Sequence, residues 1–189
     1  MAKKVKFNIR NFHYALENTT QTTSVYGTPV AIPGLRNISL DPNGETTEWF
    51  ADGVKYFVTD NNLGYEGEIE LAMLTDAFLK DVLQNALDSN NNLVEEVINE
   101  AKKFAFGFTV DSNDGPINYW FYNATASRPS VEGATKEESI DPQTDTISLS
   151  TSPIEVGGKN VVRVRSTDSS TVSNWFSAVV MPNFSDDEG

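Results

Sequence analysis

Three glutamates at alternate positions of one segment are the strongest candidates for chemistry in this chain. Glu66, Glu68 and Glu70 alternate with apolar residues and a glycine between positions 65 and 71. This period of two predicts a half-buried strand whose carboxylates share the outer face. Residues two apart on such a face lie roughly 6.5–7 Å apart, which overlaps the carboxylate separation in glycoside hydrolases. Those enzymes take their two acids from different elements across a cleft, so a solvated sheet surface is favoured and an acidic hydrolase is an alternative.

The residues needed for other kinds of catalysis are sparse. His13 is the single histidine, and its place between two aromatic residues favours a packed or surface role over that of a catalytic base. The chain has no cysteine, hence no thiol nucleophile, thiolate metal site or disulfide. Glycine spacings typical of nucleotide binding do not occur. The Asp- and Asn-rich stretches 60–62 and 88–92 lack the spacing of a calcium loop. We therefore expect no enzyme, no cofactor and no metal.

The charge of the chain limits its partners. The formal net charge is −13, and residues 41–100 carry 14 acidic residues against two lysines. Such a body argues against binding nucleic acid by neutralising phosphates. A negative wall can still face nucleic acid and keep it from sticking, while solubility alone is the plainer explanation. No apolar run approaches the ~20 residues that span a bilayer, so we expect a soluble protein that does not enter a membrane.

One helix is predicted directly after the glutamate strand, over 75–87. Thr75 suits the N-cap and Asp76 the first turn, and apolar residues follow at helical spacing. Residues 93–103 have helical spacing too, but period alone leaves helix or strand open there.

Short strands and turns account for most of the remaining chain. Strands are expected at 4–10, with a bulge or a crossing between sheets near Asn11, and at 35–40, 104–110, 117–122, 146–150, 161–165 and 175–180. Asp52-Gly53, between apolar runs, predicts a hairpin or a bulge, with a single strand bent at the glycine as the alternative. Turns are expected at 41–44, 60–64, 111–116 and 157–158. The fold class is therefore mainly β: a β-sandwich or open barrel of two packed antiparallel sheets with one flanking helix.

The domain organisation follows from the same patterns. We expect one domain over 1–182, with extended polar arms or loops near 17–34 and 126–145. Residues 183–189 form a predicted flexible acidic tail.

Several segments, in order and spacing, resemble the major tail proteins of long-tailed, siphovirus-type phages, the family that includes the phi13-type tail tube proteins. The segments are 12–15, 26–29, 32–34, 37–40, 51–52, 64–72 with the helix start at 75–78, 103–106, 122–124, 135–136, and 175–176 with Val179 and Pro182. The stretch 64–72 (GYEGEIELA) is the most specific. Over 93–103 the resemblance favours strand and loop.

The resemblance implies a structural virion protein whose hexameric rings stack into a tail tube that conducts the genome. It implies as partners further copies of itself, the tape measure protein, the tail terminator and the distal tail or tip proteins. It also implies a place in the virion tail, and in the host cytoplasm during assembly. DNA would pass without being bound tightly, and no membrane is involved.

On this hypothesis Glu66, Glu68 and Glu70 are candidate carboxylates of the lumen or the ring surface. Candidates for contacts between rings or subunits lie in the polar arms: Thr22, Val25, Tyr26, Val131 and Lys136. Two alternatives stay open. A carbohydrate- or ligand-binding β-sandwich could use Trp49, Trp120 and Trp175, and the tube could instead belong to a contractile tail or a tail-like bacteriocin.

Overall fold

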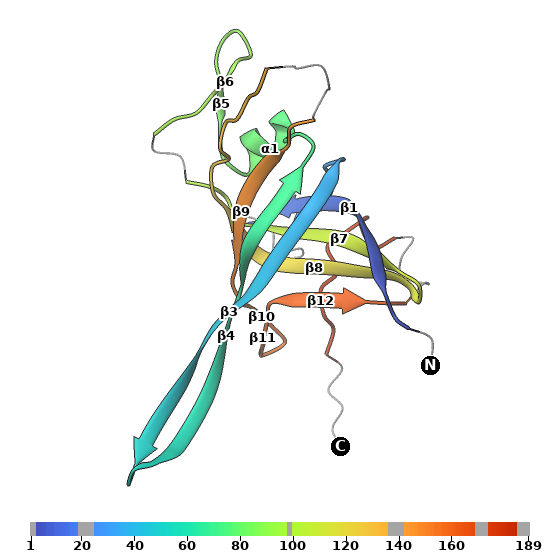
Figure 1. The fold of residues 1–189 in the computed structure, drawn as a ribbon. Helices are drawn as coiled ribbons and strands as arrows, with labels where there is room; N and C mark the ends of the chain where they lie inside the picture. The colour runs from blue at the N-terminus through green and yellow to red at the C-terminus, as the bar shows by residue number, and fades with distance from the viewer. Residues whose placement is uncertain (1–2, 19–24, 98–99, 136–141, 169–173, 185–189) are drawn as a thin grey trace.

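The computed structural model describes residues 3–18, 25–97, 100–135, 142–168 and 174–184, and it is mainly β, as predicted (Figure 1). The strands are β1 (Lys6–Leu16), β2 (Val30–Ala31), β3 (Leu35–Ala51), β4 (Val54–Leu71), β5 (Ala86–Leu87), β6 (Leu93–Val94), β7 (Phe104–Ser112), β8 (Gly115–Ala126), β9 (Asp145–Thr151), β10 (Ile154–Val156), β11 (Lys159–Val161) and β12 (Arg163–Ser166), and the helix is α1 (Asp76–Asp81). Nowhere in these ranges is there a helix with the length and apolar character that crossing a bilayer requires.

One continuous antiparallel sheet forms both layers of the sandwich. Its order is β2-β1-β7-β8-β9-β4-β3, and β12 pairs with β8 beside this path. β8 pairs with β7 along one edge, from Gly115 to Ala124. Along its other edge it pairs first with β12, from Asn118 to Phe121, and then with β9, from Ala124 to Ala126. Asn123, at a φ of 47°, lies between these two parts of the strand. The sheet therefore turns at β8, and the layer of β3, β4 and β9 covers the layer of β1, β7 and β8.

Aromatic residues from β7 and β8 fill the space between the layers. Phe104, Phe106 and Phe108 alternate along β7, and all three are buried. Phe106 stacks on Phe121 with ring centroids 5.1 Å apart. Ile69 of β4 and Ile147 of β9 enter the same core from the other layer. Each such side chain contributes about 1.5–3 kcal/mol through burial.

The helix begins where predicted but ends earlier. The Thr75 hydroxyl accepts a hydrogen bond from the Phe78 N–H at 3.3 Å, as an N-cap does. The helix stops at Asp81 rather than at 87, because Gln84 adopts a positive φ of 59°. The Gln84 side-chain amide donates to the Asp81 carbonyl at 2.7 Å and so satisfies one of the free carbonyls at the helix end.

The predicted turns at 41–44 and 60–64 were wrong, because both stretches continue long strands. Asp41 pairs with Glu66 and Asn43 with Gly64, followed by a register shift before Gly44. Pro42 fits because β3 is the outer strand of the sheet, where a missing N–H costs little. A Cβ added to Gly44 would lie 2.1 Å from the Asn61 carbonyl oxygen, so this glycine permits a close approach of backbones.

The C-terminal segment packs against the outer face of β8 without becoming a strand. The expected strand at 175–180 was wrong: 174–177 form a turn. The Trp120 indole N–H donates to the Trp175 carbonyl at 3.1 Å, and the Tyr122 hydroxyl donates to the Val180 carbonyl at 2.5 Å. These side-chain donors take the place of a strand ladder. Of the bulge or sheet crossing expected near Asn11, the structure has the bulge, seen as a register shift between Arg10 and His13. The predicted strand at 161–165 is divided between β11 and β12. Over the described part of 93–103, only Leu93–Val94 is a strand, and no helix forms.

Candidate functional site

The three glutamates lie together on the outer face of β4, between β3 and β9. Glu68 is paired in register with Ser39 on one side and Ser148 on the other. Glu66 and Glu68 are exposed, whereas Glu70 is half-buried. Glu70 accepts hydrogen bonds from Arg36 at 3.0 Å and from the Thr144 hydroxyl at 2.6 Å. The face is therefore hydroxyl-rich and acidic, with one of its three carboxylates neutralised at one end.

The geometry of this face does not resemble that of a hydrolase site. A shallow hollow of about 490 Å³ lies over the row. Its lining combines Glu66 and Glu68 with mostly small and hydroxyl residues from 125–127 and from β9, and among the described residues no facing element adds an acid to it. Within the described ranges, no group of three or more His, Asp or Glu side chains is placed to hold a metal ion. The face can repel anions and bind water, but it holds no second acid across a cleft.

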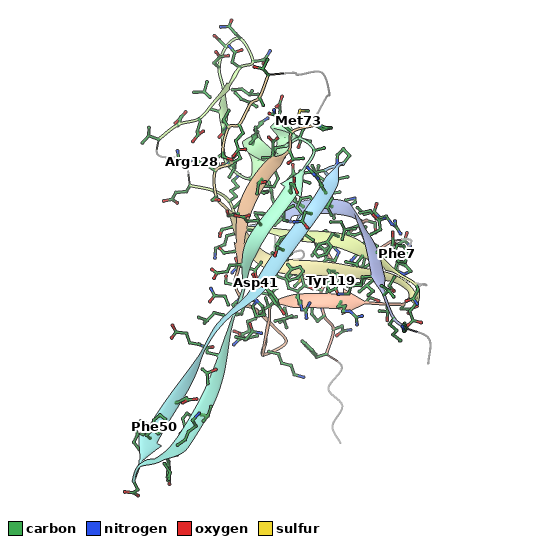
Figure 2. The ribbon with its side chains drawn as sticks, in the orientation of Figure 1. Phe7, Asp41, Phe50, Met73, Tyr119 and Arg128 are labelled. Carbon is green, nitrogen blue, oxygen red and sulfur yellow. The ribbon has the colours of Figure 1, made fainter. Side chains whose placement is uncertain are left out.

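A long hairpin extends β3 and β4 far beyond the sandwich (Figures 1 and 2). β4 pairs with β9 only from Glu66 to Leu71, so the part of the hairpin nearer its tip is a ribbon of two strands. Asp52 and Gly53 form its turn with φ values of 53° and 77°, as in the two-residue turns with two positive φ values. Of the possibilities that the sequence left open at Asp52-Gly53, the structure has the hairpin.

The tip of this hairpin is unusually apolar for an exposed surface. Trp49 is 58% exposed and Tyr56 is 71% exposed, and their rings meet edge to face with centroids 5.7 Å apart. Phe50, Val54, Phe57 and Val58 are exposed beside them. Contiguous exposed apolar residues of this kind mark interaction surfaces. Sequence reasoning identified the turn but missed the surface, although aromatic residues on both strands beside Asp-Gly were a usable signal.

The outer edge of β3 is a second surface suited to assembly. Among the described residues β3 pairs only with β4, and β12 pairs only with β8, so each leaves one edge open. An open edge presents backbone N–H and C=O groups to which another strand can pair.

The proposed contact residues of the polar arms are placed differently from one another. Val131 is 98% exposed and Val25 is exposed too. Tyr26 is buried, stacks on Tyr122 at 6.1 Å, and its hydroxyl accepts from the Asn123 N–H at 3.0 Å. Thr22 and Lys136 lie outside the described residues.

The three tryptophans do not form a common groove. Trp120 is fully buried and Trp175 is 3% exposed, and both belong to the small core beneath the C-terminal segment. Trp49 is on the distant hairpin. His13 stacks on Phe176 at 4.3 Å, and its Nδ1 lies 2.9 Å from the Asn11 carbonyl oxygen. No acid–base pair forms around it in the described structure.

No protein-family model and no curated protein matches this chain. Among solved structures, a chain of the sheath–tube complex of an extracellular contractile injection system (PVC), in the extended state, is similar over 84% of this chain and 90% of its own, with 11% identity and a TM-score of 0.46. A chain of the six-fold symmetrised baseplate of the anti-feeding prophage is similar over 82% of this chain and 92% of its own, with 10% identity and a TM-score of 0.41. At these scores and identities, neither likeness assigns a function to this chain.

Proposed function

We propose that this protein is a structural subunit of a tail tube of the phage type, which assembles with copies of itself into stacked hexameric rings. The sequence resemblance to major tail proteins suggests the class. One structural observation carries the proposal: β3 runs from an open sheet edge in the body into a protruding hairpin with an aromatic tip. A single chain thus offers two exposed surfaces that favour association.

The arrangement suits a ring because its contacts are of the head-to-tail kind. An edge and a protruding arm are different surfaces, so the contact between copies joins unlike patches. Repeating such a contact closes a ring when the rotation between copies allows it. We assign the polar arms near 17–34 and 126–145 to contacts between rings, with Val25 and Val131 as the exposed candidates. In this proposal residues 1–182 act as one domain and 183–189 as an acidic tail.

The glutamate face is assigned to the lumen. Glu66, Glu68 and their hydroxyl neighbours would line the wall along which the genome moves. A negative wall gives no counterion release on contact with phosphates, so DNA would slide without being held. Tape measure, terminator and tip proteins would then meet the two ends of the tube.

Negative-stain electron microscopy of the purified, concentrated protein tests the proposal. Rings or hollow tubes with sixfold symmetry are the expected result. Failure to polymerise even with a tape-measure and tip complex would overturn it. A glycan-binding module remains a second candidate from the sequence, but the burial of Trp120 and Trp175 removes the groove on which it depended.

A further inference from the structure

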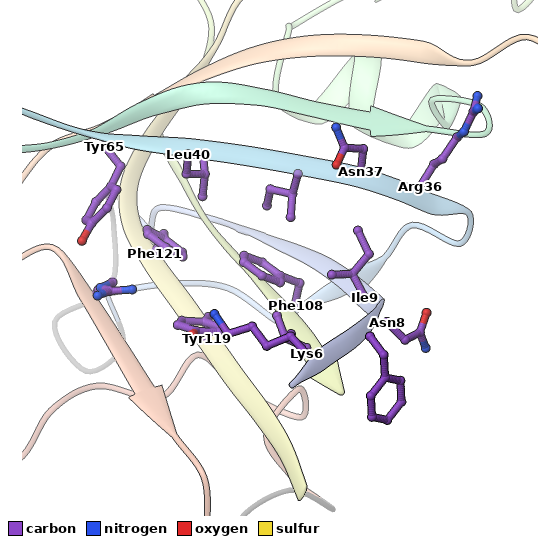
Figure 3. Close-up of a pocket in the computed structure, with 14 residues that line it drawn as sticks. Lys6, Asn8, Ile9, Arg36, Asn37, Leu40, Tyr65, Phe108, Tyr119 and Phe121 are labelled. Carbon is purple, nitrogen blue, oxygen red and sulfur yellow. The ribbon is translucent and has the colours of Figure 1, made fainter. Parts of the chain in front are cut away.

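An open groove of about 550 Å³ lies where the layer of β3 and β4 parts from the layer of β7 and β8 (Figure 3). Its floor is aromatic, with Phe108 from β7 and Tyr119 and Phe121 from β8. The three rings stack at centroid distances of 5.2–6.1 Å. Leu40 of β3 and Ile9 of β1 form its apolar walls. The groove is therefore an extension of the core that remains open to solvent.

The rim of this groove is positive in a strongly negative protein. Lys6, Arg36 and Arg163 line it, and none of the described carboxylates does. The Arg163 guanidinium lies 5.2 Å from the Tyr65 ring centroid and 5.7 Å from that of Tyr119. Arg36 pairs with Glu70, but within the described ranges neither Lys6 nor Arg163 has an ion-pair partner. The groove thus fits an occupant that is both apolar and acidic.

The hairpin tip of the same chain has this chemistry. Its aromatic side chains are exposed, and residues 45–58 carry three carboxylates, Glu45, Glu48 and Asp52, against one cation, Lys55. Lys55 is already paired with Glu48. An aromatic ring placed beside Arg163 would gain a cation–π contact, and the carboxylates would face Lys6 and Arg163.

The hairpin cannot fill the groove of its own copy. In Figure 2, Phe50 lies at the far end of the protruding hairpin, whereas Phe7 and Tyr119 lie in the body. The occupant must come from another molecule, and every further copy supplies the same acidic, aromatic tip.

We infer that this groove binds the β3–β4 hairpin tip of a second copy of this chain. The inference deepens the proposed function and rests on it for its biological setting. β3 supplies both a wall of the groove and one strand of the hairpin. The same strand therefore connects the groove, which receives the tip of one neighbour, to the tip, which enters the groove of the next neighbour. The interface is head-to-tail, so it propagates from copy to copy.

Disulfide mapping tests this inference on the full chain, which has no native cysteine. Tyr56→Cys is mixed with Phe7→Cys, at the mouth of the groove, and the concentrated mixture is mildly oxidised. Tyr56→Cys mixed with Ser148→Cys, exposed on the outer face of β9, is the matched control. Leu40→Cys provides a second position inside the groove. We expect a disulfide-linked heterodimer at both groove positions at several times the control yield. A yield no higher than the control at both positions overturns the inference, even where microscopy shows tubes.

Charge reversal gives an independent test. Arg163→Glu places a negative charge on the rim, and Lys102→Glu makes the same change of charge at an exposed lysine that lies outside the groove and outside the polar arms. We expect Arg163→Glu to weaken self-association in sedimentation experiments by about tenfold or more, which corresponds to about 1.4 kcal/mol, while Lys102→Glu stays close to the parent. Equal association of both variants contradicts docking in the groove. Absence of rings or tubes from all samples counts against the tube proposal instead, and the disulfide yields then decide on the groove.

Discussion

At the scale of single residues, Tyr26 ties one arm of the chain to the bend in β8. Its hydroxyl accepts from the Asn123 backbone N–H, and burial raises the pKa of Tyr26 to about 12 because a phenolate would lose its hydration. A folded-state pKa above the ordinary value of 10 means that folding favours the neutral phenol. This stabilisation is complete below pH 10 and is lost as the pH rises from 10 to about 12.

We therefore expect the free energy of unfolding to fall between pH 10 and pH 12, and to fall less in Tyr26→Phe. Urea denaturation followed by circular dichroism at pH 9, 10, 11 and 12 measures the difference. Because Tyr14 and Tyr122 also have pKa values raised chiefly by burial, the variant keeps part of the decline. An identical pH dependence in the two proteins would show that Tyr26 does not titrate as its burial requires.

The roles of single residues could be predicted from the sequence where they depend on nearby residues in the chain. The N-cap role of Thr75 and the bulge near Asn11 depend on neighbours within a few positions, and both were predicted correctly. The buried role of Tyr26 depends on Asn123, which is 97 positions away. The spacing of residues along the chain gives no indication of that contact.

At the scale of elements, β4 is both a wall of the core and part of the protruding hairpin, and its Gly67 allows β3 to approach. A Cβ at this position would lie 1.9 Å from the Ser39 carbonyl oxygen. We expect Gly67→Ala to separate β3 from β4 and to lower the melting temperature strongly. Gly133→Ala, where an added Cβ meets nothing within 4 Å, is the control and should melt like the parent. Equal melting curves in a thermal scan would contradict the close pairing of β3 and β4.

Matched phenylalanine truncations separate the core from the hairpin tip. Phe106→Ala removes a fully buried ring and should cost about 3–5 kcal/mol in the free energy of unfolding. Phe57→Ala removes a ring that is 55% exposed, so we expect a change within about 0.5 kcal/mol. The same Phe57→Ala variant should lose self-association. Chemical denaturation and sedimentation measure the two effects, and normal assembly by Phe57→Ala would argue against the tip as a contact.

Strand length was the property of elements least accessible from the sequence. Asp41-Pro42-Asn43-Gly44 has the composition of a turn, yet its backbone pairs with residues 62–66 of β4. Pairing overrode local preference because an edge strand tolerates proline and because glycines allow the two backbones to approach. In the helix, by contrast, local backbone conformation overrode the longer pattern. Gln84 has a positive φ and ends the helix, although apolar residues continue at helical spacing to 87.

At the scale of the whole molecule, opposite charges are separated onto different surfaces. The glutamates of β4 form one negative face, whereas the groove beside β12 is positive. We expect simultaneous reversal of Glu66, Glu68 and Glu70 to lysine to give assemblies that bind DNA, with an affinity that falls steeply as salt rises. Reversal of Glu95, Glu96 and Glu100, which are exposed elsewhere, is the control of equal charge. Filter binding over a salt series compares the two triple variants.

Equal DNA binding by the two triple variants would contradict the proposed assignment of the glutamate row to a lumen. The glutamate row was predictable from the sequence because residues that alternate with a period of two lie on the same face of a strand. The positive groove was not, because its lining residues come from β1, β3, β4, β7, β8 and β12 and meet only in the folded chain.

The continuous course of β3 and β4 from body to tip also has a mechanical consequence. A pull on the tip, directed along the hairpin, runs nearly parallel to β4 where it pairs with β9 from Glu66 to Leu71. Antiparallel hydrogen bonds lie perpendicular to the strands, so such a load shears them together instead of opening them one after another. A filament of copies joined through these tips would resist stretching through the sheets of its subunits and would be softer to bending at the two-stranded ribbons between them.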